Sequence, residues 1–136
     1  MNIAFGSDEY TVLTDAVRAD LEARGHRVVA VDDGEWAAVG RAVGEQVASG
    51  ACATAVLFCW TGTGASIAAN KVAGVRAALC TDAATAAGAR KWNDANVLVM
   101  GYGRQSLMDE YPAILDAWFA TDPDPGEAVN IAQLDF

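Results

Sequence analysis

Short apolar segments alternate five times with helical patterns along this chain of 136 residues. After each apolar segment comes a stretch in which apolar residues recur every three to four positions, as on one face of a helix. The predicted strands are residues 2–5, 26–31, 53–58, 75–80 and 96–100, and the predicted helices are 10–24, 36–48, from 66 onward, 82–92 and 106–119. This alternation predicts an α/β domain: a three-layer, Rossmann-like sandwich with a five-stranded parallel sheet.

One domain and a terminal arm account for the length. Residues 1–121 contain the whole alternation, and a chain of this size can bury one core. Residues 122–136 begin with Asp-Pro-Asp-Pro-Gly and are expected to form an extended arm. The arm carries apolar residues that could dock on a neighbouring subunit, with a frayed end as the alternative: Ile131, Leu134 and Phe136.

Composition excludes several classes of partner. The net charge of −9 argues against nucleic acid and against an anionic membrane surface. No apolar run reaches the length of a membrane span. Three cysteines favour a reducing, cytoplasmic location over a disulfide framework. A single histidine and the lack of paired-cysteine spacing argue against a structural zinc site.

The segment from Cys59 to Ser66 carries the most chemical information. A thiol ends the third predicted strand, and a turn containing Gly62 and Gly64 leads from it towards a helix. The backbone N–H groups of such a turn can bind an anion, and glycine permits close approach of a ligand. Ligands of parallel sheets gather at the carboxyl ends of the strands, where Asp8 also lies. Cys59 is therefore a candidate base or nucleophile, with a buried packing role as the alternative.

Several motifs together resemble one family. Residues 3–8, 59–64, 66–71 (Ser-Ile-Ala-Ala-Asn-Lys), 74–77 and 93–97 resemble those of type B ribose-5-phosphate isomerases and the related galactose-6-phosphate isomerase subunits. The resemblance extends from residue 2 to about residue 119, so residues 1–121 resemble a whole sugar-phosphate isomerase domain. It implies an aldose–ketose isomerase without a metal or organic cofactor, which moves a proton between neighbouring carbons through a cis-enediolate.

The resemblance also implies roles for individual residues. Cys59 would be the base as a thiolate, favoured by the helix dipole, and the loop after it would form the anion hole. Asp8 would contact sugar hydroxyls, and Asn93 would reach the substrate of a partner subunit, so a homodimer or higher homo-oligomer with shared sites is expected. The candidate catalytic residues are Cys59, Thr61 and Asp8, and the candidate residues for binding a carbohydrate-like small molecule are Glu9, Gly62, Thr63, Gly64, Ser66, Asn93, Trp36, Trp60, Trp92 and Arg104.

The departures from the family pattern affect ring opening and the pocket. Glu9 stands where the family usually has a histidine, and Trp92 replaces the ring-opening histidine. Trp36 replaces a tyrosine. Trp60 replaces a glycine beside the base, and its ring could either narrow the pocket or point into the core. Stacking of these rings on a sugar face would suit a substrate without phosphate.

The phosphate site is also altered. The family binds phosphate partly with arginines of its last segment, whereas residues 105–136 contain neither Lys nor Arg. Arg104 alone would be a thin phosphate site, and an ion pair is the alternative role for it. We therefore expect an isomerase that acts on an unphosphorylated sugar or hydroxy-ketone rather than ribose 5-phosphate. The alternative is a non-catalytic subunit or binding protein that pairs with an active paralogue.

Overall fold

The computed structural model describes residues 1–32 and 34–134, so Asp33 and the predicted contact of Phe136 lie outside the described residues. The strands are β1 (Asn2–Ser7), β2 (Arg27–Val31), β3 (Thr54–Cys59), β4 (Ala77–Leu79) and β5 (Val97–Gly101). The helices are α1 (Val12–Ala23), α2 (Trp36–Ala48), α3 (Thr63–Asn70), α4 (Ala83–Asn93), α5 (Leu107–Ala120) and α6 (Ala128–Ala132), with a 3₁₀ turn, η1, over Pro125–Glu127.

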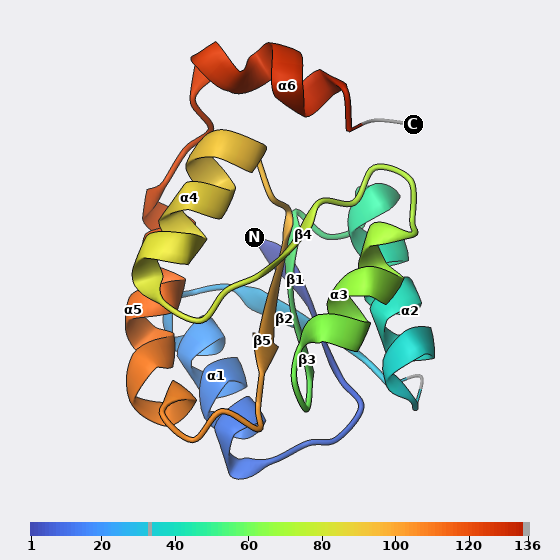
Figure 1. The fold of residues 1–136 in the computed structure, drawn as a ribbon. Coiled ribbons are helices and arrows are strands. Elements are labelled where there is room, and N and C mark those ends of the chain that lie inside the picture. Colours follow the sequence, from blue (N-terminus) through green and yellow to red (C-terminus); the bar gives the residue numbers. More distant parts are fainter. Residues whose placement is uncertain (33, 135–136) are drawn as a thin grey trace.

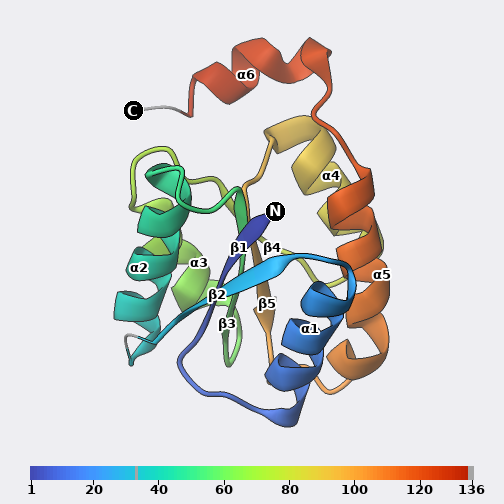
Figure 2. The ribbon, with the colours of Figure 1, turned by 180° about the vertical axis from the view of Figure 1, so that it is seen from behind.

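All five strands are parallel and lie in the order β2-β1-β3-β5-β4. Helices α1, α4 and α5 cover one face of the sheet, and α2 and α3 cover the other (Figure 1; Figure 2, from behind). The predicted three-layer α/β sandwich with a five-stranded parallel sheet is therefore confirmed. The right-handed connections of parallel strands place each helix on its face.

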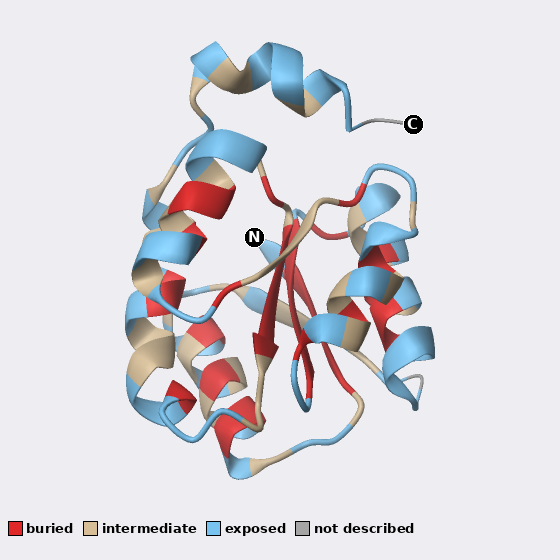
Figure 3. Ribbon diagram, in the orientation of Figure 1, coloured by how far each residue is buried: buried red, intermediate tan, exposed pale blue. Residues whose placement is uncertain are grey.

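The two faces of the sheet carry different side chains. Large residues such as Phe5 and Phe58, whose rings meet edge to face at 5.7 Å, lie on the face of α1, α4 and α5. The opposite face is built of smaller residues, and Gly40 lets α2 approach α3, since a Cβ there would lie 2.8 Å from that of Ala68. The buried strands in Figure 3 show that this double core encloses the middle of the sheet and leaves its ends free.

Two elements differ from their predicted bounds. Helix α3 begins at Thr63 instead of Ser66, because the chain turns directly into the helix at Gly62. Strand β4 is shorter than predicted, because the N–H of Arg76 donates to the side-chain oxygen of Asn96 at 2.7 Å instead of joining the ladder.

The arm is not extended as expected. Proline and an Asp124 side chain that accepts from the N–H of Gly126 start η1, and α6 follows. The N–H of Asp124 donates to the carbonyl of Lys91, which ties the arm to α4. Helix α6 lies beyond the amino ends of the strands, at the top of Figure 1, and leaves Val129 75% exposed. Within residues 1–32 and 34–134, the helices are all too short or too polar to cross a bilayer.

Helix α4 begins with a side-chain cap, as the sequence predicts. The carboxylate of Asp82 accepts from the N–H of Thr85 at 2.7 Å, and this hydrogen bond lowers the pKa of Asp82. The group therefore stabilises the fold above its unfolded pKa of about 3.9, and this contribution is lost as the pH falls through the lowered folded value.

Replacement of Asp82 by alanine should lower the urea midpoint at neutral pH and have a smaller effect near pH 2, because the wild-type carboxyl is then protonated as well. Asp82→Asn keeps an acceptor without the charge and should fall between the two. Equal midpoints for the wild type and Asp82→Ala at neutral pH would show that the cap contributes nothing.

Candidate active site

The candidate site lies where the strand order reverses. The chain passes from β1 to β2 on one side and then to β3 on the other, and such a reversal opens a crevice at the carboxyl ends of the two central strands. Ser7 pairs with Phe58, so the next residues, Asp8 and Cys59, lie beside each other at this edge. The edge faces downward in Figure 1.

The loop after Cys59 is fixed against the end of β5. Its backbone carbonyl accepts from the N–H of Tyr102 at 3.1 Å, and the carbonyl of Trp60 accepts from the N–H of Gly103 at 2.9 Å. Gly62 has φ +83°, and a Cβ there would lie 2.4 Å from Leu79 Cδ1. Only glycine satisfies both the left-handed backbone and this close contact.

The first turn of α3 provides donors beside the thiol. The hydroxyl oxygens of Thr61 and Thr63 are 2.7 Å apart, and the N–H of Thr63 donates to Thr61 Oγ1 at 3.3 Å. The N–H groups that follow, at Gly64 and Ala65, are in the first turn and have no intrahelical acceptor. Together with the positive end of the helix dipole they can stabilise an oxyanion.

A cavity of about 340 Å³ borders these groups. This volume is at the lower end of the range for small-molecule sites. Cys59 is only 5% exposed, so its thiol lies in the wall of the cavity and is largely screened from solvent. Seven of the candidate residues line this one cavity: Asp8, Trp36, Cys59, Trp60, Thr61, Thr63 and Gly64.

Two exposed indole rings flank the cavity. Trp36, the first residue of α2, packs on Gly64, where a Cβ would lie 2.8 Å from its ring. Trp60 is 64% exposed and meets the ring of Tyr102 edge to face, with centroids 5.7 Å apart. Of the two orientations considered for Trp60, the structure therefore shows the one at the pocket and not the one in the core.

A second cavity, of about 310 Å³, lies on the other side of Trp60 and Thr61. The Cys80 thiol is in its wall, and burial raises the pKa of this thiol to about 12, which keeps it protonated. Arg104 also lines this cavity, but its guanidinium donates to both carboxylate oxygens of Glu110 at 3.2 Å. The ion pair considered as the alternative role of Arg104 is thus present.

Tyr102 is the residue that the sequence analysis missed. Its hydroxyl lies 3.0 Å from Asp8 Oδ1 and 3.4 Å from Glu9 Oε2. Burial raises the pKa of Tyr102, and the neighbouring carboxylates raise it further, so the hydroxyl stays protonated. Its place directly after Gly101, at the end of β5, was the available signal, because that end lies on the same edge as Cys59.

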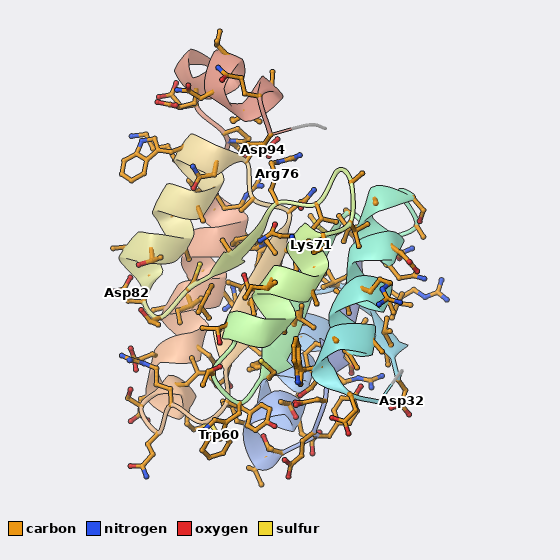
Figure 4. All side chains as sticks on the ribbon, turned by 45° about the vertical axis from the view of Figure 1, so that its right-hand side comes forward. Asp32, Trp60, Lys71, Arg76, Asp82 and Asp94 are labelled. Carbon is orange, nitrogen blue, oxygen red and sulfur yellow. The ribbon has the colours of Figure 1, made fainter. Side chains whose placement is uncertain are left out.

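Three candidates lie away from the cavity within this chain. Trp92 and Asn93 end α4, which runs from the carboxyl edge of the sheet back to the amino edge. In Figure 4, Asp94 lies at the end of the molecule opposite Trp60. Ser66 lines a different groove, together with Leu134 of the arm. One chain therefore does not bring these residues to Cys59.

Histidine and metal chemistry are not placed at this edge by the described residues. The single histidine, His26, precedes β2 at the amino edge and stacks on Phe119 with centroids 4.7 Å apart. Within residues 1–32 and 34–134, no group of three His, Cys, Asp or Glu side chains is arranged to hold a metal ion.

Comparison with known proteins gives consistent relatives over the whole fold. The sequence model described as Ribose/Galactose Isomerase matches residues 3–133. Ribose-5-phosphate isomerase B of Escherichia coli is 36% identical over 132 residues, which are 91% of this chain and 87% of that protein. D-erythrulose-4-phosphate isomerase 2 of Mycolicibacterium smegmatis is 36% identical over 84% of this chain and 80% of its own length. The structure of Clostridium thermocellum ribose-5-phosphate isomerase B has a TM-score of 0.91 and 33% identity, and the match covers 98% of this chain and 95% of that chain.

Proposed function

The chain belongs to the Ribose/Galactose Isomerase family, and we propose that it is an aldose–ketose isomerase, an intramolecular oxidoreductase, with Cys59 as the base. The observation that carries the proposal is the cavity in which this thiol meets the first turn of α3. Both features are needed for proton transfer beside a carbonyl: a base over the carbon, and donors for the oxygen that gains charge.

The proposed step moves one proton and one electron pair. The Cys59 thiolate removes the proton from the hydroxyl-bearing carbon next to the carbonyl, and the electrons of the C–H bond form the C=C bond of a cis-enediolate. The charge on its oxygens is stabilised by the N–H groups of Gly64 and Ala65 and by the hydroxyls of Thr61 and Thr63. The Cys59 thiol then returns the proton to the former carbonyl carbon, which restores the thiolate.

We propose further that the substrate lacks phosphate. A phosphate dianion normally draws several charge-assisted donors. Here Asp8 and Glu9 bring two carboxylates to the mouth of the site, and Arg104 is paired with Glu110. Residues 105–136 supply no cation. An unphosphorylated sugar or a hydroxy-ketone in its open-chain form suits this charge distribution and the absence of a ring-opening histidine.

We propose that the complete site forms between two copies of the chain. Asn93 and Trp92 lie at the amino edge of the sheet, so they can reach a Cys59 cavity only if that cavity belongs to a second copy. The same observation also supports a second candidate function, a non-catalytic subunit whose partner is an active paralogue. The two candidates differ in whether the purified chain exchanges substrate hydrogen by itself.

Deuterium wash-in tests the proposal. The purified protein is incubated in heavy water with open-chain and cyclic aldoses, ketoses and hydroxy-ketones, and with ribose 5-phosphate and ribulose 5-phosphate. We expect deuterium to enter at the carbon beside the carbonyl of an unphosphorylated compound, as followed by NMR. Exchange of the phosphates alone would overturn the substrate assignment, and exchange of none of them would favour the non-catalytic subunit.

A further inference from the structure

Tyr102 connects the two sides of the crevice between β1 and β3. Its backbone N–H donates to the carbonyl of Cys59 at 3.1 Å, so the residue is anchored beside the base. Its side chain reaches back across the sheet, and its hydroxyl donates to Asp8 at 3.0 Å. The edge of its ring packs against Trp60. Tyr102 is therefore held from three directions, and its hydroxyl has a defined position.

The hydroxyl of Tyr102 has a single hydrogen to donate, and two carboxylates lie within reach of it. The shorter contact, to Asp8, takes that hydrogen, and Glu9 at 3.4 Å is left with little share of it. One oxygen of Asp8 and both oxygens of Glu9 are thus free to accept from a ligand. Two acceptors held side by side match two neighbouring hydroxyl groups, which are donors without charge.

The surrounding charges favour the same kind of ligand. The titratable groups that face Tyr102 are Asp8 and Glu9 on the β1–α1 loop and Cys59 on β3. The nearby cation, Arg104, is neutralised by Glu110. An anionic group placed against Asp8 and Glu9 would be repelled, whereas a hydroxyl would be bound.

We propose that Tyr102 is a positioning residue which holds Asp8 and Glu9 as paired acceptors for two adjacent hydroxyl groups at the uncharged end of the substrate. The proposal rests on the proposed function in that it names the part of the substrate that this site selects. The probes in its test carry no carbonyl group, so the result does not depend on turnover.

The experiment measures binding of a five-carbon sugar alcohol, and of its terminal phosphate ester, to the full nitrogen-15-labelled chain. The amide signals of Asp8, Glu9 and Tyr102 are followed by NMR. We expect the sugar alcohol to shift these signals and to bind more tightly than the phosphate ester. In Tyr102→Phe the dissociation constant should rise about three- to ten-fold, because the acceptors are no longer held in place.

Two further variants make the result specific. Tyr10→Phe is the matched control, since it also loses a hydrogen-bonded hydroxyl at the same edge, where Tyr10 donates to the carbonyl of Val31 at 3.2 Å. Its dissociation constant should equal that of the wild type. Glu9→Gln should reduce the preference for the sugar alcohol over the phosphate ester, because one repelling charge is removed.

The proposal is overturned by tighter binding of the phosphate ester, by the lack of shifts at these amides with the sugar alcohol, or by equal affinities in Tyr102→Phe and the wild type. Hydroxyl binding that depends on Tyr102, in a protein that fails the wash-in test with every compound, would leave this inference standing and refute the isomerase. Exchange activity that is the same in Tyr102→Phe and the wild type would do the reverse.

Discussion

Replacement of Cys59 by alanine should lower the rate of deuterium wash-in about a hundred- to ten-thousand-fold, the usual contribution of a positioned general base. The thiol lies in the wall of the 340 Å³ cavity, beside the first turn of α3. Alanine removes the group that takes the proton but leaves the donors of Thr61 and Thr63 in place, so binding should change less than turnover. The measurement is the exchange rate at saturating substrate, with the substrate that the wild-type protein accepts.

Cys52→Ala is the matched control for this experiment. It removes another buried thiol, just before β3, at the amino end of the same strand. Its exchange rate should equal that of the wild type once the fraction of folded protein is matched. Unchanged exchange in Cys59→Ala would refute the proposed base, and an equal loss in both variants would show that the effect comes from packing.

The fold was predictable because the local patterns agree with the tertiary structure. The bounds of α2, residues 36–48, are those predicted, since Val39 and Val43 recur at helical spacing and are both fully buried. The start of α3 was predicted too late, since the left-handed conformation of Gly62 depends on its contact with Leu79, which no local pattern records. The family resemblance inferred from the motifs is confirmed by the match over residues 3–133.

The candidate site was predictable to the extent that topology determines it. Asp8 and Cys59 end neighbouring parallel strands, so a pattern of strands and helices was enough to bring them together. The contact between Tyr102 and Asp8 joins residues 94 positions apart and depends on the order of the strands, which was not predicted. The positions of Trp92 and Asn93 at the opposite edge follow from the direction of α4, so a site within one chain was never available to them.

Replacement of Gly62 by alanine should both destabilise the fold and impair the site. The φ of +83° costs an alanine about 1–2 kcal/mol. Its Cβ would also lie 2.4 Å from Leu79 Cδ1 and 3.2 Å from the backbone of Gly101, and overpacking of this kind costs about 1–3 kcal/mol more. We expect the free energy of unfolding to fall by about 2–5 kcal/mol, as measured by urea denaturation.

The matched control is Gly50→Ala, at the turn after α2. Gly50 has φ +82°, and a Cβ there would meet nothing within 4 Å, so this variant should show only the cost of the left-handed backbone, about 1–2 kcal/mol. The difference between the two variants measures the close approach of the loop to β4 and β5. Because a shift of about 1 Å in a catalytic group can cost a hundred-fold in rate, Gly62→Ala should also lose exchange activity while still folded, and Gly50→Ala should retain it. Equal stability losses in the two variants would show that the loop after Cys59 is free to move, and an anion hole made of its N–H groups would then not be preorganised.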